Sequence, residues 1–288
     1  MDLETIVVSH GAEGLLRRCL RSLEEHPAGG ETRVTVVDSG STDSAPEMVE
    51  REFPRVRLIR RGNIGFSAAN NLVLCEVEAD AVLLLNPDTE VYAGTLDRAL
   101  ARLRSDPRMG MVGCKLVTEN GELDHAAKRS FPTPLAALAH FTGIGRRADA
   151  PAALSQYRAT HLGDDEPGEV DAVNGAFMLC RAAAVRDVGP LDEGYWLYME
   201  DLDWCRRFWE RGWKVFYEPA AVALHVKGGS SGGRRAFRQE VAFHRGMGRF
   251  YRRFDGPRHN PLLNGLVYAG IGAKLLASLA VTATRSRR

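Results

Sequence analysis

The chain has 288 residues, 44% of them apolar, which is enough for one substantial hydrophobic core. Its five cysteines are odd in number and lack Cys-x-x-Cys spacing, which argues against a disulfide framework or a zinc site and favours a reducing cytoplasm. The formal net charge of +1 hides an asymmetry, because from Arg234 onward twelve Lys and Arg face only two Asp and Glu, a net +10. Such a basic end favours contact with an anionic surface.

The start of the chain shows no charged region followed by a long apolar stretch, so we expect no secretion signal. Strand-like and helical patterns then alternate. We expect strands at 5–9, 33–38, 56–60 and 81–85, and helices at about 15–23, 45–53, 67–77 and 95–105. This order predicts an α/β fold with a mainly parallel central sheet flanked by helices.

The second half is less regular at first. Residues 115–168 are rich in Pro, Ala, Gly and charge, and we expect loops there with a helix or two. Regular patterns return at 170–180, followed by a helix at 201–211 and two strands at 214–217 and 221–225.

Two glycine-containing segments with small polar side chains are candidates for nucleotide binding. The first reads VTVVDSGSTD at 34–43 and places Asp38 at the carboxyl end of a strand, where open α/β sheets bind ligands. A carboxylate there can accept the imide N–H of uracil or thymine; the alternative is a helix cap at Ser41 or Asp43. The second, GNIGFSAANN at 62–71, fits either a nucleotide or sugar-diphosphate site or a turn leading into a helix.

Acidic residues follow two apolar runs, and we expect both groups to face one solvent-filled cleft. Asn86-Pro87-Asp88 is a candidate metal site, because Mg²⁺ and Mn²⁺ prefer oxygen ligands shared with phosphates, but it is also a common turn tripeptide. His225 leaves the last strand and is either a metal or diphosphate ligand or a structural histidine.

The second acidic group reads MEDLDWC at 199–205 and begins a helix after the aromatic segment 195–198. On a helix Glu200 and Asp203 are neighbours while Asp201 points elsewhere, so the three cannot share one ligand. Asp201 or Glu200 is then a candidate general base in a partly apolar environment. The alternative is the favourable electrostatics of acids at a helix N-terminus.

Taken in order, these segments resemble glycosyltransferase family 2, the inverting enzymes with the GT-A fold, over about residues 5–231. The matching pieces are IVVSH, VVDSGSTD, GNIGFSAANN, LLLNPDTE, VNGAFMLCR, VGPLDEGYWLYMEDLDWCRR and HVKGGSS. Within the family, the chain looks most like bacterial rhamnosyltransferases of cell-wall or surface polysaccharide synthesis. The resemblance implies a catalytic domain at 1–233, with a nucleotide-binding half at about 1–115 and an acceptor-binding half at about 116–233. A basic, partly apolar helical extension would occupy 234–288.

The resemblance also implies roles for matching residues. Asp201 would be the catalytic base with Glu200 beside it, and Trp196 and Asp203 would lie on the acceptor side. Asp88 and His225 would bind a divalent cation, Mg²⁺ or Mn²⁺. The donor would be held by Ser9, Asp38, Ser41, Asn63, Gly65, Asn70 and Asn86. Asn86 replaces the first acid of the usual Asp-x-Asp motif, which puts strict metal dependence in question.

We therefore expect an inverting transferase that moves a sugar, best matched by L-rhamnose from dTDP-rhamnose, to a glycan or polyprenyl-diphosphate-linked saccharide. A UDP-sugar donor is the alternative, because uracil offers Asp38 the same imide as thymine. A sugar-phosphate nucleotidyltransferase is disfavoured, since its N-terminal loop needs a basic residue and the loop at 9–14 has none. A non-enzymatic binding module is disfavoured by the matching Asp88 and Asp201.

The last apolar segment, 262–283, contains several glycines and Lys274 near its centre. We expect an interfacial amphipathic helix at the inner face of the cell membrane, and no nucleic-acid partner. A helix packed on the catalytic domain, or on a second subunit of a homodimer, is an equal alternative.

Overall fold

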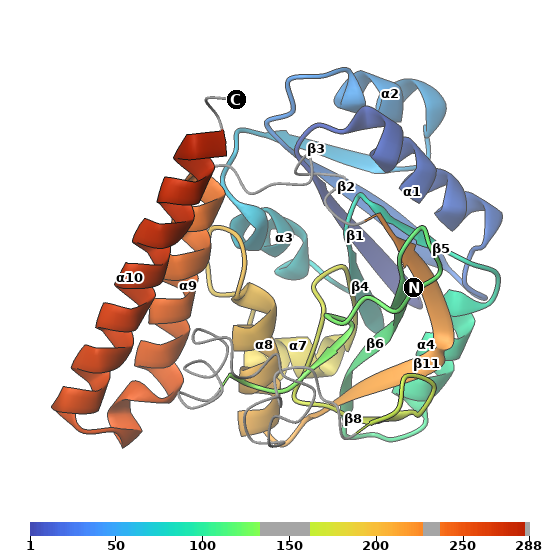
Figure 1. Ribbon diagram of the computed structural model, residues 1–288. Helices are drawn as coiled ribbons and strands as arrows, with labels where there is room; N and C mark the ends of the chain where they lie inside the picture. Colours follow the sequence, from blue (N-terminus) through green and yellow to red (C-terminus); the bar gives the residue numbers. More distant parts are fainter. Residues whose placement is uncertain (133–161, 227–236, 286–288) are drawn as a thin grey trace.

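The computed structural model describes residues 1–132, 162–226 and 237–285 (Figure 1). Its centre is a nine-stranded sheet in the order β3-β2-β1-β4-β10-β6-β11-β5, with β8 paired to β11. The strands are β1 (Leu3–Ser9), β2 (Thr32–Ser39), β3 (Arg57–Arg61), β4 (Ala81–Leu85), β5 (Thr89–Val91), β6 (Met109–Val117), β8 (Gly168–Glu169), β10 (Phe177–Arg181) and β11 (Lys214–His225). Two further short strands, β7 (Lys128–Arg129) and β9 (Ala172–Val173), form a separate antiparallel pair.

The four strands from β3 to β4 are parallel, as the alternating pattern predicts, and β6 is parallel to β11. Strand β10 runs antiparallel between β4 and β6. Helices cover the sheet (Figure 1). They are α1 (Glu13–Glu25), α2 (Ala45–Glu52), α3 (Phe66–Leu74), α4 (Thr95–Arg104), α7 (Ala182–Val188), α8 (Glu200–Glu210), α9 (Phe237–Phe254) and α10 (Pro261–Arg285), with a 3₁₀ turn at Gly256–Arg258.

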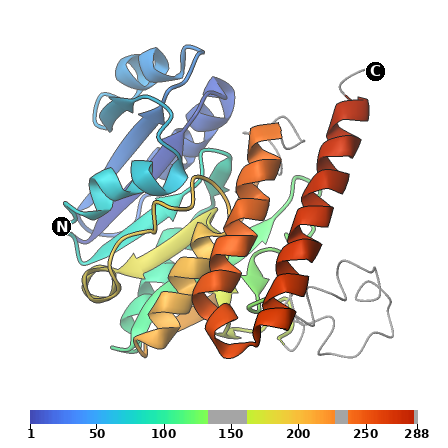
Figure 2. The ribbon, with the colours of Figure 1, turned by 90° about the vertical axis from the view of Figure 1, so that its left-hand side faces the viewer.

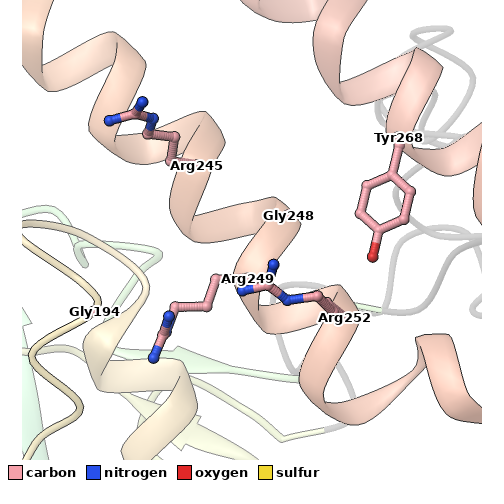
Figure 3. A pocket seen from close by; sticks show the side chains of 6 residues that line it. All are labelled: Gly194, Arg245, Gly248, Arg249, Arg252 and Tyr268. Atoms are coloured by element: carbon pink, nitrogen blue, oxygen red, sulfur yellow. The ribbon is translucent and has the colours of Figure 1, made fainter.

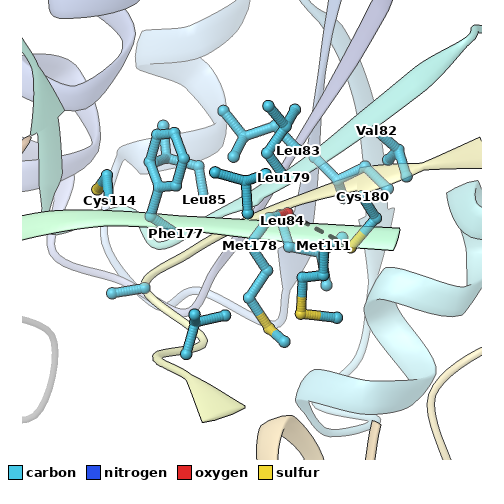
Figure 4. Packing of buried hydrophobic residues seen from close by; sticks show 14 of the residues in the cluster. Val82, Leu83, Leu84, Leu85, Met111, Cys114, Phe177, Met178, Leu179 and Cys180 are labelled. Carbon is cyan, nitrogen blue, oxygen red and sulfur yellow. Dashed lines mark hydrogen bonds between the residues drawn. The ribbon is translucent and has the colours of Figure 1, made fainter. Parts of the chain in front are cut away.

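Apolar spacing explains how these elements pack. Helix α1 buries Leu16, Cys19, Leu20 and Leu23, which share one face at helical spacing. Every residue of β4 is buried, because the strand lies between neighbours on both edges and beneath helices. Figure 4 shows β4 side chains beside those of β10 and β6, and the register pairs Leu83 with Leu179. This core holds the carboxyl ends of the strands rigidly in place.

Strand β6 was not predicted, and its two glycines are the reason, because glycine lowers strand propensity. A Cβ at Gly110 would lie 2.7 Å from Phe208 and Trp213, and one at Gly113 would lie 2.5 Å from Val173. Both glycines therefore admit close packing of other elements on β6. The two strands predicted at 214–217 and 221–225 form the single strand β11, with a register shift between Glu218 and Val222 around Pro219.

The last two helices lie side by side along one flank of the molecule (Figure 2). Helix α9 buries His244, Phe250, Tyr251 and Phe254, whereas no described side chain of α10 is buried. The predicted loops at 133–161 and the segment Lys227–Ser231 lie outside the described residues.

Candidate functional site

The turns after β1 and β2 interlock at the carboxyl edge of the sheet. Asp38, the next-to-last residue of β2, is buried, and its Oδ1 accepts a hydrogen bond from the Ser41 amide at 3.2 Å. Ser41 Oγ accepts from the Gly11 amide at 2.7 Å, and the Ser9 hydroxyl donates to the Gly11 carbonyl at 3.1 Å. The predicted donor residues Ser9, Asp38 and Ser41 are thus brought together.

The segment after β3 completes this edge. His10 Nδ1 lies 2.8 Å from the Ser39 carbonyl, and its Nε2 lies 3.4 Å from Asn63 Nδ2. Gly40 has φ +77°, and a Cβ there would lie 2.9 Å from the Asn63 backbone nitrogen. Asn63 therefore joins the Asp38 turn as expected. The alternative of a helix cap at Ser41 or Asp43 is not what the structure has, because the N-cap residue of α2 is Ser44. Asp43 accepts instead from the first amides of α1 and α2, those of Glu13 and Ala45.

Gly65 connects this edge to the loop before α8. It has φ +91°, and a Cβ there would lie 2.7 Å from the Trp196 carbonyl oxygen. The next amide, Phe66, donates to that same carbonyl at 2.8 Å. Asn70 differs from the expectation of a donor-pocket residue, because it is buried in α3 and donates to the Phe66 carbonyl at 2.9 Å.

Asp88 and His225 face each other at the junction of β5 and β11. His225 Nε2 lies 3.5 Å from Asp88 Oδ1, and His225 Nδ1 lies 2.9 Å from Asp124 Oδ2. Burial lowers the pKa of His225, but the hydrogen bonds to Asp124 and Asp88 outweigh it and raise the pKa to about 9. Without a cation the imidazole is therefore protonated at neutral pH, and its Nε2 can bind a cation only after losing that proton. A second carboxylate that orients the ring in this way is typical of metal-binding histidines.

The protein supplies few ligands for a cation. Within residues 1–132, 162–226 and 237–285, no group of three or more His, Cys, Asp and Glu has metal-ligand geometry. Asp88 and His225 alone fit a cation that takes its other ligands from a substrate diphosphate and water, as Mg²⁺ commonly does. Asn86 lies half-buried two residues before Asp88, where it ends β4.

Asp201 lies in the first turn of α8 and is held by Arg129. Its Oδ2 accepts from Arg129 Nη2 at 2.5 Å and from the Gly175 amide at 3.2 Å. Its Oδ1 accepts from the Leu202 amide at 2.8 Å. Three elements, α8, β7 and the turn before β10, therefore fix the orientation of this carboxylate.

Glu200 beside it is fully enclosed. Burial, together with the charge of Asp201, raises the pKa of Glu200 to about 8, so its carboxyl group is protonated at neutral pH. Tyr198 and Met199 precede it with φ values of +70° and +72°. Strained backbone of this kind is common at functional sites.

Asp203 does not fit the expected acceptor-side role. Its side chain has 0% exposure and accepts from Arg207 at 2.7 Å and from Arg253 at 3.1 Å. Tyr195 Oη lies 3.3 Å from the same carboxylate. Burial raises the pKa of Asp203, against the influence of Arg207 and Arg253. Asp203 thus ties α9 to α8 and has no exposed oxygen for a sugar.

Trp196, also expected on the acceptor side, is half-buried in the loop before α8. The guanidinium of Arg238 lies 4.0 Å from the centre of its ring, so the first turn of α9 covers one face of the indole.

The expectation of an open cleft with both carboxylates exposed is wrong for this structure. Asp88 is 4% exposed and the Asp201 side chain 12%. The covering residues are Arg129, Asp124 and His225, of which the sequence analysis identified only His225. Arg129 and Asp124 belong to the stretch that we treated as irregular, where no periodicity marks a functional position.

Comparisons with known proteins agree with this architecture. The sequence matches the Glycosyl transferase family 2 model over residues 5–183. It is 31% identical over 247 residues to N-acetylglucosaminyl-diphospho-decaprenol L-rhamnosyltransferase of Mycobacterium tuberculosis, covering 80% of this chain and 78% of the relative. It is 26% identical to Rhamnosyltransferase WbbL of Escherichia coli K12, covering 76% and 81%. The chain belongs to glycosyl transferase family 2 and is a glycosyltransferase.

A solved structure supports the fold. Mannosyltransferase PcManGT from Pyrobaculum calidifontis, in complex with GDP-Man and Mn²⁺, superposes with a TM-score of 0.60 at 18% identity. The match covers 99% of this chain and 79% of that one. The predicted GT-A fold is confirmed.

Proposed function

We propose that the chain is an inverting rhamnosyltransferase that uses dTDP-rhamnose and a polyprenyl-diphosphate-linked saccharide at the cytoplasmic face of the membrane. The observation that supports this most directly is the contact of Gly65 and Phe66 with Trp196. It joins the Asp38 edge of the sheet to the loop that leads into α8, whose first turn contains Asp201. A nucleotide held at Asp38 would then present its sugar toward α8. The named substrates of the mycobacterial relative favour rhamnose and a lipid-linked acceptor.

In the proposed reaction Asp201 accepts the proton of an acceptor hydroxyl. The oxygen forms a bond to the anomeric carbon while the bond from that carbon to the diphosphate oxygen breaks. The bonding electrons leave with the nucleoside diphosphate, and the configuration inverts through an oxocarbenium-like transition state. Arg129 and the Gly175 amide hold Asp201 in place for this transfer.

Asp88 and His225 would hold a divalent cation, with Asp124 orienting the imidazole. Such a cation neutralises charge on the departing diphosphate, so the leaving group needs no protonation. Because Asn86 contributes no charge, the site relies on Asp88 as its acidic ligand. Asp38 would accept the imide N–H of thymine, with Ser9, Ser41 and Asn63 around it.

The base is tested with Asp201→Asn. We expect transfer to fall by about 10²–10⁴-fold, with binding of dTDP-rhamnose retained. Replacing Asp201 alone removes the carboxylate that neutralises the buried Arg129, which endangers folding. The double variant Arg129→Gln/Asp201→Asn removes that problem, and Asp187→Asn on exposed α7 is the control. Transfer at close to the wild-type rate by either Asp201 variant would disprove the assignment.

The donor is tested by thermal-shift screening with dTDP-rhamnose, UDP-sugars and GDP-mannose, with and without Mn²⁺. We expect the largest rise in Tm with dTDP-rhamnose plus Mn²⁺, because only a ligand of the folded state stabilises it. The rise should shrink in Asp88→Asn. A greater rise with a UDP-sugar would instead support the alternative donor.

A further inference from the structure

A cavity of about 560 Å³ lies between α9, α10 and the loop before α8, away from the residues assigned to transfer. It is lined by Gly194, Arg245, Gly248, Arg249, Arg252 and Tyr268 (Figure 3). The three arginines share one face of α9, since they are spaced by three, four or seven residues. Tyr268 reaches toward them from α10 in Figure 3. The cavity is therefore cationic along one wall.

Two of its arginines are available to a ligand. Arg249 is already committed, because its guanidinium donates two hydrogen bonds to Asp192 at 2.8 and 3.0 Å. Arg245 and Arg252 are exposed and have no ion-pair partner in the described part of the chain. Exposed guanidinium groups without a carboxylate partner suit phosphate groups.

Helix α10 beside the cavity is apolar on its outer side. Its polar residues turn toward α9, where Asn264 Oδ1 accepts from the Tyr251 hydroxyl at 2.7 Å and the Tyr268 ring contacts Tyr251 edge-on. Leucines point outward instead, with Leu262, Leu266 and Leu276 at 75%, 63% and 71% exposure. The segment Pro261–Ala283 is long and apolar enough to cross a membrane, and only 6% of it is buried.

A helix that faces water carries polar side chains on its exposed face, whereas α10 carries apolar side chains there. The alternative, a helix packed on the catalytic domain, would carry polar residues outward, but the exposed face of α10 carries Leu262, Leu266 and Leu276 among alanines and glycines, as an interfacial helix would. An exposed apolar face of this size marks a contact with a membrane or another protein. The net +10 of residues 234–288 selects an anionic bilayer as the occupant, by charge complementarity.

We propose that the cavity binds the phosphate headgroup of an anionic phospholipid, while the outward leucines of α10 contact its acyl chains. Arg245 and Arg252 would donate to the phosphate oxygens, and Tyr268 would lie at the level of the headgroups, where tyrosine is favoured. An acidic peptide would match the arginines but would leave the leucines in water. The inference does not depend on the identity of the sugar or the acceptor.

The test is flotation of the full-length protein with vesicles of phosphatidylcholine alone or with phosphatidylglycerol. We expect binding to the mixed vesicles, and a fall of roughly 30-fold in affinity for Arg245→Gln/Arg252→Gln, since each basic side chain contributes about 1 kcal/mol at such a surface. The matched control is Arg55→Gln/Arg186→Gln, which removes the same charge from exposed positions elsewhere. It should bind within about twofold of wild type.

Further arms separate the alternatives. Leu266→Asn/Leu276→Asn changes only exposed side chains and should also weaken flotation. Inorganic phosphate without vesicles should raise Tm little, because it lacks the acyl contact. Equal losses in both arginine pairs, or strong stabilisation by phosphate with no flotation, would overturn the proposal. Asp201→Asn should float like wild type, so a failed transferase assignment would leave this result unaffected.

Discussion

Glu200 has an unusual environment for a carboxyl group in the first turn of a helix. It is 6% exposed, and its Oε2 has no hydrogen-bond partner among the described residues. Burial and the adjacent Asp201 favour the neutral acid, which raises the pKa from 4.5 to about 8. A neutral Glu200 avoids a second buried negative charge beside the ion pair of Arg129 and Asp201.

This arrangement predicts a pH-dependent stability. Between pH 4.5 and about 8 the folded protein holds a proton on Glu200 that the unfolded chain has lost, so the free energy of unfolding falls as pH rises. Glu200→Gln removes this pH-dependent contribution to the free energy of unfolding. We expect the variant to gain stability relative to wild type across this window, by an amount on the order of a few kcal/mol, as measured by urea unfolding at several pH values.

The control is Glu210→Gln at the exposed end of the same helix, which should give a difference from wild type that does not change with pH. If the stability difference between Glu200→Gln and wild type also did not change with pH, Glu200 would be ionised in the folded protein at neutral pH.

The sequence revealed some of these residues and not others, for a physical reason. Asp38, Asp88 and Asp201 each follow a recognisable strand or begin a recognisable helix, so local pattern identifies them. Arg129 and Asp124 pair with residues 72 and 101 positions away, and only the fold brings them together. Buried charges that act through distant partners leave no periodic signal.

At the level of elements, the turn between β3 and α3 contacts Trp196 in the loop before α8 through Gly65 and Phe66. This contact connects the Asp38 edge of the sheet with the helix that contains Asp201. Gly65 has φ +91° and ψ 164°, a conformation open essentially to glycine alone. Gly65→Ala should lower the free energy of unfolding by about 1–3 kcal/mol and weaken donor binding, because a Cβ there would displace Trp196. Chemical unfolding and donor titration measure the two effects.

Gly62 in the same segment provides the matched control. A Cβ there meets nothing within 4 Å, so Gly62→Ala should change neither quantity appreciably. Equal effects at both positions would mean that the segment, rather than the contact with Trp196, determines donor binding.

Elements with a strong period were predictable, and elements built around glycine were not. The parallel strands β1, β2 and β4 and the helix α1 were all predicted within a few residues, because continuous or periodic apolar runs specify them. Strand β6 was missed because Gly110 and Gly113 are selected by the packing of other elements on them, which a local reading of the sequence does not contain.

Across the whole molecule, the predicted extension at 234–288 divides into two helices with different roles. Helix α9 adds Phe250 and Phe254 to the hydrophobic core, and Arg249 and Arg253 neutralise Asp192 and Asp203. Helix α10 buries no described side chain. We therefore infer that the catalytic unit continues through α9 and ends before Pro261.

Two truncations test this boundary by thermal unfolding. Ending the chain after Asn260 removes α10 with the hydrogen bonds of Asn264 to Tyr251, Gly256 and His259 and the ring contact of Tyr268 with Tyr251. At about 1 kcal/mol for each hydrogen bond, Tm should fall by less than about 10 °C. Ending it after residue 236 also removes two buried phenylalanines, at about 3–5 kcal/mol each, and leaves the buried Asp203 short of one cation. We expect that shorter chain to unfold or aggregate at ordinary temperature. A stable, cooperatively folding protein without α9 would instead place the boundary near 233, because the core would then be complete without Phe250 and Phe254.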